Sequence, residues 1–209
     1  MLAQVLDRVI AFAARDEAAL LRAREAWAES AGKVFHDDPL YEERTTAFLE
    51  WFALERPGDD GRVPAERFLA EEQLDDLEGQ WAHALSRAHR SLFEVREVSD
   101  DGHILVDDLL AGNAFAVSER RRLPGIEPGE ILEARVVANI VRPPEVLFTR
   151  AFQFHPREAM IELRRQAVRA RAAGEPRATT LFRLLRLRLK ALRYGHVAAA
   201  KIYAEHEQS

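Results

Sequence analysis

Cysteine is absent from all 209 residues of the chain. Its absence excludes disulfides, thiolate zinc sites and cysteine nucleophiles, and it fits a reducing compartment. No apolar run approaches the ~20 residues that span a membrane, and Asp7 and Arg8 interrupt the first apolar stretch. We therefore expect a cytoplasmic protein that has no membrane partner.

Proline and glycine are also scarce, with 9 and 10 residues, whereas hydrophobic residues make up 47% of the chain. A chain of this composition and length buries a substantial core as one or two compact domains. The glycines occur singly, so no phosphate-binding glycine loop is present, and no serine lies in a Gly-x-Ser-x-Gly motif. The sequence leaves an enzyme open but favours a protein without catalytic residues or a cofactor.

Histidine offers no metal-binding pattern. His83 and His89 are six residues apart, roughly 240° around a helix, and so do not share a ligand face. The pair His36-Asp37 is similar to that of helical metal-dependent phosphohydrolases, but those sites need an upstream histidine and none precedes His36. The sequence therefore predicts no metal site.

Residues 1–91 have the apolar periodicity of helices. Apolar side chains recur every three to four positions in segments 2–30, 41–56 and 74–88, and Gly32 ends the first of them. Three or four helices are expected in this region.

The period changes near residue 91. Short runs rich in Val, Ile and Phe are separated by Asp101-Gly102 and Gly112-Asn113, both good hairpin turns. We expect residues 92–154 to form either a five-stranded antiparallel meander or a small SH3-like or OB-like barrel.

The expected strands also carry polar residues. Polar and apolar residues alternate over most of segment 131–140, which predicts one buried face. Asp107 and Asp108 are adjacent in another strand and so point to opposite faces, which excludes an acid/base pair. One of them is expected to accept hydrogen bonds from backbone amides ahead of Gly112.

Helical periodicity returns after the sheet, from Pro156 to Gly174 and from about Thr179 to His206. The fold class is therefore α+β. Three regions are expected to pack as one compact unit: helices at 1–91, a β-meander or small barrel at 92–154, and two basic helices at 155–209.

The net charge of −5 hides a strong asymmetry. Residues 151–200 contain eleven Arg and Lys against three Asp and Glu, whereas residues 1–150 contain 18 basic and 30 acidic side chains. Either the two parts neutralise one another within the fold, or the basic helices meet an external anionic surface.

The last helix is amphipathic, with a leucine face and a basic face. Arg188 is the exception, because it falls within the apolar arc, where it must snorkel or pair with a carboxylate from the first 150 residues. A run of arginines near residue 120 is either a solvated rim or a phosphate-facing patch. The candidate residues for binding a partner or nucleic acid are Arg120, Arg121, Arg122, Arg164, Arg165, Arg183, Arg186, Lys190 and Arg193.

The chain also contains the segments TAFLEWFALERPGDDGRVPAERFL, SRAHRSLFEVREV, VDDLLAGNAFAVSE and PGEILEARVV. Together they resemble a pattern in uncharacterised bacterial proteins, some of which carry a C-terminal cysteine-rich SEC-C metal motif. The resemblance covers roughly residues 45–140 and implies no established activity. A zinc role does not transfer, because this chain lacks cysteine.

These patterns predict a non-enzymatic module for interaction with, or regulation of, another protein. The alternative is an accessory protein that uses the basic helices to bind nucleic acid without sequence preference, because their basic face carries no Asn, Gln or Ser to read base edges.

Overall fold

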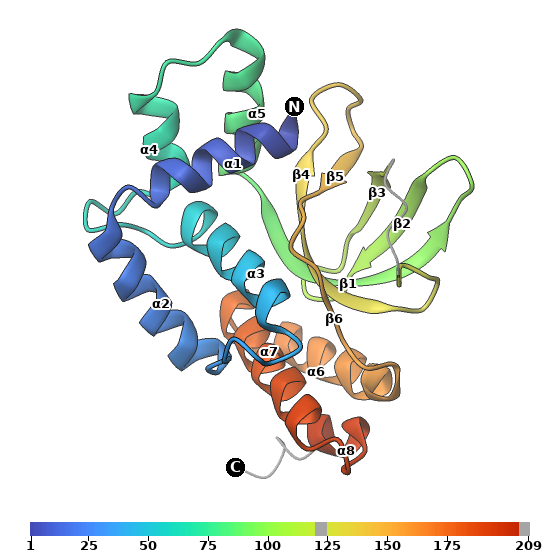
Figure 1. Ribbon diagram of the computed structural model, residues 1–209. Helices are drawn as coiled ribbons and strands as arrows, with labels where there is room; N and C mark the ends of the chain where they lie inside the picture. Colours follow the sequence, from blue (N-terminus) through green and yellow to red (C-terminus); the bar gives the residue numbers. More distant parts are fainter. Residues whose placement is uncertain (120–124, 205–209) are drawn as a thin grey trace. The chain divides into compact units, whose positions relative to one another are not determined.

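The computed structural model of the chain describes residues 1–119 and 125–204 (Figure 1). Helices and strands alternate in blocks, as the α+β class predicts. The helices are α1 (Leu2–Ala13), α2 (Glu17–Ala31), α3 (Tyr41–Leu54), α4 (Pro64–Glu71), α5 (Asp76–Ser86), α6 (Met160–Ala173), α7 (Arg177–Arg193) and α8 (Ala199–Ala204), with a 3-10 turn at Arg157–Ala159. The strands are β1 (His89–Val98), β2 (His103–Asp108), β3 (Ala114–Ser118), β4 (Ile131–Ala138), β5 (Val146–Phe148) and β6 (Gln153–Phe154).

The strands form one sheet in the order β1-β2-β3-β5-β4-β6, and an additional pairing between β1 and β4 closes β1–β5 into a barrel. Of the two predicted alternatives, the small barrel is confirmed and the five-stranded antiparallel meander is wrong. The pairs β1–β2, β2–β3 and β4–β5 are antiparallel. Because a closed ring of five strands cannot alternate direction at every step, the barrel is mixed.

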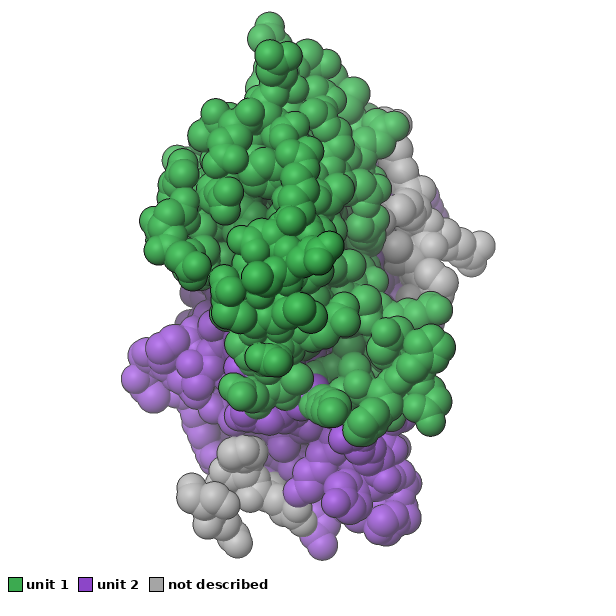
Figure 2. Space-filling model, turned by 60° about the vertical axis from the view of Figure 1, so that its left-hand side comes forward, with its two compact units in different colours: residues 1–29, 33–89, 135–151 green, residues 30–32, 90–134, 152–209 purple. Residues whose placement is uncertain are grey.

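The chain divides into two units, coloured separately in Figure 2. The first unit comprises Met1–Glu29, Lys33–His89 and Arg135–Ala151. The second comprises residues 30–32, 90–134 and 152–209. Both β1 and β4 run from one unit into the other, so the units do not follow the order of the sequence.

Residues 1–91 contain five helices rather than the expected three or four. The long helix predicted for residues 2–30 is in fact two, α1 and α2, separated by a turn at Ala14–Asp16. Asp16 starts α2, since its carboxylate accepts a hydrogen bond from the Ala19 amide at 2.9 Å. The apolar periodicity runs through this break and therefore did not reveal it.

Aromatic side chains fill the core of the first unit. Trp27, Phe48 and Trp51 pack together with ring centroids 5.2 to 6.4 Å apart. Phe12 and Phe68 make an edge-to-face pair at 5.6 Å between α1 and α4. Aromatic burial of this kind supplies much of the energy that holds such short helices together.

The predicted hairpin turns are present. Gly102 has φ of +86°, and a Cβ there would lie 2.4 Å from the Glu119 carbonyl oxygen, so the position requires glycine. Ahead of Gly112, the buried Asp108 carboxylate accepts hydrogen bonds from the amides of Leu110 and Ala111, both at 2.9 Å. The turn-stabilising role expected for one of the adjacent aspartates is confirmed.

Strand β4 departs from the prediction of one buried face, because its first seven residues are all buried. Glu133 and Arg135 lie on the face that the alternation predicted to be solvated. Each is buried with a partner of opposite charge, Glu133 with Arg90 and Arg135 with Glu55. Ion pairing therefore allows the polar face of this strand to leave water.

The C-terminal helices pack into the core of the second unit. As predicted, α6 ends at Gly174, and this glycine adopts the left-handed conformation. The second predicted helix, from Thr179 to His206, is instead two, because α7 ends at Arg193 and α8 begins at Ala199. The expected leucine face is buried in α7, apart from Leu192, which is 40% exposed.

Candidate interaction surface

The basic residues predicted as a binding surface fall into three groups. Arg120, Arg121 and Arg122 lie outside the described residues. Arg164 and Arg165 lie on α6, and the other candidates lie on α7.

Both predicted arginines of α6 pair with carboxylates inside the second unit. Arg164 donates two hydrogen bonds to Glu94 on β1, at 2.7 and 3.0 Å. Arg165 reaches both carboxylate oxygens of Glu162, one turn earlier in the helix, at 2.7 and 2.8 Å. These pairs direct the two guanidinium groups toward the protein's own acidic residues.

The basic face of α7 is only partly a continuous surface. Arg183 is half-buried and pairs with Glu175 at 2.6 Å. Arg186, Lys190 and Arg193 are exposed at helical spacings of four and three, and so form one stripe. The structure therefore places three of the four α7 candidates on one exposed stripe, whereas Arg183 pairs with Glu175.

Arg188 is buried in the second unit, at 8% exposure, as its place in the apolar arc predicted. Its Nε donates to the Phe154 carbonyl oxygen at 2.5 Å and its Nη1 to the Gln153 side-chain oxygen at 2.9 Å. Both of these acceptors are neutral and lie after residue 150. The carboxylate expected from the first 150 residues stays a prediction.

An exposed apolar stripe on α6 was not predicted. Ile161 and Val168 are 68% and 62% exposed and lie seven residues apart, on one face of the helix. Leu163, Ala167 and Ala170 bury the opposite face. A helical wheel of this segment shows both stripes, so the signal was available in the sequence.

A network of buried charges in the first unit was not predicted. In the first unit Glu50 is fully buried and accepts hydrogen bonds from the Thr149 hydroxyl at 2.7 Å and from the Arg150 amide at 3.2 Å. Arg135 lies between Glu50 and Glu55, with its Nε 3.5 Å from a Glu50 oxygen and its Nη2 2.5 Å from a Glu55 oxygen. Arg135 lies far from Glu50 and Glu55 in the sequence. No local sequence pattern therefore predicts this network.

His155 and Tyr203 form a buried polar pair in the second unit. His155 Nδ1 lies 2.8 Å from the Tyr203 hydroxyl, and the Gln166 amide donates to the Tyr203 carbonyl at 2.6 Å. Burial, with a smaller effect of the nearby Arg188, lowers the pKa of His155 from 6.5 to about 3. Burial likewise raises the pKa of Tyr203, so both side chains are neutral near pH 7.

We expect this buried histidine to make the second unit sensitive to acid. Below pH 6.5 the unfolded chain binds a proton at His155, whereas the folded chain binds one only near pH 3. The free energy of unfolding therefore falls as the pH drops through this window. Between pH 6.5 and 4.5 the loss is roughly 2–3 kcal/mol.

Urea unfolding at pH 7 and pH 4.5 tests this expectation, with His155→Gln as the matched variant. Glutamine keeps a hydrogen-bonding group but does not titrate, so the variant should lose correspondingly less stability between the two pH values. Equal losses in both proteins contradict the assignment.

Within residues 1–119 and 125–204, no three His, Cys, Asp or Glu side chains are grouped to hold a metal ion. Among the same residues, none of the helices is long and apolar enough to cross a membrane.

Residues 22–160, more than half of the chain, match a family described as a family of unknown function (DUF7986). The chain belongs to this family. No curated protein and no solved structure matches it significantly. The DUF7986 match ends at Met160, the first residue of α6. It therefore includes the barrel but not Ile161 and Val168.

Proposed function

We propose that the protein is a non-enzymatic interaction module that uses α6 to bind an acidic, amphipathic segment of another protein. The observation that carries the proposal is the outward stripe of Ile161 and Val168. Two large apolar side chains seven residues apart on one exposed helix face have the spacing of the anchors by which an amphipathic helix docks on a partner.

Charge complementarity supports an acidic partner. Arg164 and Arg165 flank the stripe, and α6 also carries Arg169 and Arg171. An apolar centre with an arginine rim is the usual composition of a protein interface. The carboxylates that now hold Arg164 and Arg165 are partly exposed, so a partner's carboxylates compete with them at small cost.

The barrel supports protein rather than nucleic acid as the ligand. Because β5 lies between β3 and β4 in the sheet, the strand order is a Greek-key order, which favours the OB-like alternative over a simple meander. OB-like barrels bind oligonucleotides across strands 2 and 3. Here Asp107 of β2 faces Glu94 of β1 across the strands, and each carboxylate pairs with an arginine, Asp107 with Arg96 and Glu94 with Arg164. These pairs leave no excess of positive charge on this part of the barrel to attract phosphates.

Photo-crosslinking in the native cell tests the docking surface. A benzophenone amino acid in place of Val168 should give a discrete protein adduct, whereas the same group at the exposed Ala18 of α2 should not. Adding Ile161→Asp should abolish the adduct without unfolding the protein, since Ile161 is exposed. The cross-linked peptide should alternate acidic and apolar residues at helical spacing.

Three results contradict the proposal. They are equal yields at positions 168 and 18, an adduct with nucleic acid, and an adduct only with a second copy of this chain.

The second candidate function is nucleic-acid binding without sequence preference. Arg186, Lys190 and Arg193 support it, because they form an exposed basic stripe on α7. The stripe is short, and three residues neutralise few phosphates. For this reason we rank it below docking at α6.

A further inference from the structure

An open cleft of about 790 Å³ lies within the first unit. Its lining comes from the end of α1, the start of α2, α4 and the loop between α3 and α4. The side chains of Phe12 and Phe52 contribute apolar surface. Clefts of this volume are common sites for small molecules.

Several arginines from different segments line this cleft. They are Arg15, Arg22, Arg56, Arg62 and Arg67. The guanidinium carbons of Arg15 and Arg67 lie 5.1 and 5.9 Å from the centroid of the Phe12 ring, and that of Arg56 lies 5.4 Å from the Trp51 ring. An aromatic ring fixes the plane of a guanidinium and leaves its N–H edge available to an oxyanion.

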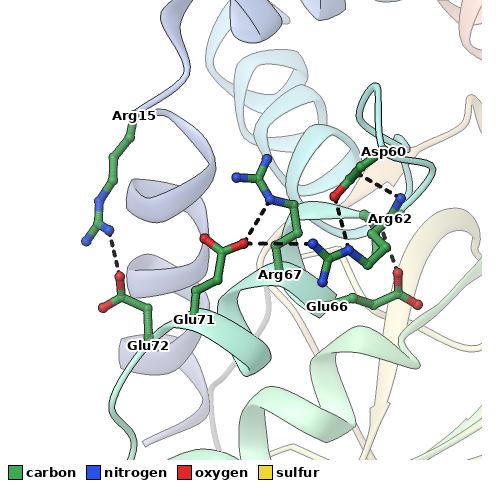
Figure 3. A network of polar contacts seen from close by, with 8 residues as sticks. Arg15, Asp60, Arg62, Glu66, Arg67, Glu71 and Glu72 are labelled. Atoms are coloured by element: carbon green, nitrogen blue, oxygen red, sulfur yellow. Dashed lines mark hydrogen bonds and ion pairs between the residues drawn. The ribbon is translucent and has the colours of Figure 1, made fainter.

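One carboxylate already occupies a position between two of these arginines. A single oxygen of Glu71, Oε1, lies 3.3 Å from Arg67 Nε and 4.0 Å from Arg62 Nη2, and Figure 3 shows both side chains directed at it. Neither contact is bidentate. Glu71 thus marks a place where two guanidinium groups converge on one oxyanion and hold it weakly.

The other ion pairs of the cleft are also weak. Arg62 Nε donates to Asp60 at 3.0 Å, and Arg15 pairs with Glu72, as Figure 3 shows. Arg22 lies 3.4 Å from Asp59, whose side chain is 96% exposed. Exposed single contacts of this kind exchange readily with water and with other anions. The arginines are therefore available to a ligand that offers more oxygens.

We propose that this cleft, independently of docking at α6, binds a small phosphate-bearing molecule whose phosphoryl group replaces the Glu71 carboxylate between Arg62 and Arg67. A phosphoryl group presents three terminal oxygens and accepts paired hydrogen bonds from several guanidinium groups at once. The acidic residues Asp16, Glu17, Asp59 and Asp60 also line the cleft, and they repel a long polyanion and so favour a compact one.

Calorimetric titration with pyrophosphate at constant ionic strength tests this site, because two substitutions should change the affinity in opposite directions. Arg67→Gln removes a donor and should weaken binding on the order of tenfold. Glu71→Gln removes the competing carboxylate and should strengthen binding about threefold or more. Arg142→Gln removes one exposed arginine that does not line the cleft, and should leave affinity unchanged.

Urea unfolding verifies that each variant is folded. Weaker or unchanged binding in Glu71→Gln, or equal effects of Arg67→Gln and Arg142→Gln, overturns the proposal, as does the absence of binding in a wild-type protein shown to be folded. Vesicles containing phosphatidic acid distinguish a lipid headgroup from a soluble phosphate. Binding to such vesicles without binding to pyrophosphate also contradicts the assignment.

Discussion

Replacing Arg188 with alanine should lower the free energy of unfolding by about 3–5 kcal/mol. The buried guanidinium donates to the Phe154 carbonyl and to the Gln153 side-chain oxygen, and its loss removes this donor from both acceptors at a largely buried position. A buried acceptor without a donor costs about 1–3 kcal/mol, and the space vacated by the side chain adds to the loss.

The matched variant is Arg186→Ala, two residues earlier on the exposed side of α7. It should change stability by less than about 0.5 kcal/mol. Urea unfolding of both variants at pH 7 compares them directly. Small and equal effects contradict the burial of Arg188, and a large effect of Arg186→Ala contradicts the exposed basic stripe.

Replacing Arg135 with alanine should destabilise the protein by a similar amount, about 3–5 kcal/mol. Glu50 is fully buried, and Arg135 is the cation that lies between it and Glu55. Without Arg135 the buried Glu50 carboxylate loses a neighbouring cation, and removing one partner of a buried charge pair is costly.

A double-mutant cycle with Glu50→Gln identifies the cause. Glutamine carries no charge, and it can accept the hydrogen bond of the Arg150 amide with its oxygen while its NH2 group donates to the Thr149 hydroxyl oxygen. The loss in the double variant should therefore be smaller than the sum of the single losses, by more than about 1 kcal/mol. Additive losses, measured by urea unfolding, show that Arg135 acts through packing alone.

Local features of the fold were predictable because short stretches determine them. Gly102 and Gly112 occupy the turns that their dipeptides predicted, and both have positive φ. Asp108 stabilises the second turn with hydrogen bonds to residues two and three positions later. The helical periodicity of the last segment likewise predicted that Arg188 is buried.

Long-range features were not predictable, and β4 shows why. Two kinds of strand share an alternation of polar and apolar residues. One has a face in water, and the other has its charged residues paired in the interior. The deciding partner of Glu133 is Arg90, which lies 43 residues earlier in the chain. Closure of the barrel is equally non-local, since it depends on the pairing of β1 with β4.

The candidate surface was predicted from charge alone, and charge was an incomplete guide. Arg164, Arg165 and Arg183 are basic in sequence but pair with Glu94, Glu162 and Glu175 in the structure. The exposed stripe on α6 was overlooked because apolar residues at helical spacing usually indicate a core face. This helix has two such faces, and only one of them is buried.

The central claim is that the arginines of the C-terminal helices serve folding and protein docking rather than contact with phosphates. Fluorescence anisotropy of a labelled DNA oligonucleotide, single-stranded or duplex, tests it most directly at about 0.15 M salt. The account predicts no saturable binding, and no change when Arg186, Lys190 and Arg193 are all replaced by glutamine. Saturable binding at about 1–100 μM that weakens steeply with salt and is lost in the triple variant contradicts it.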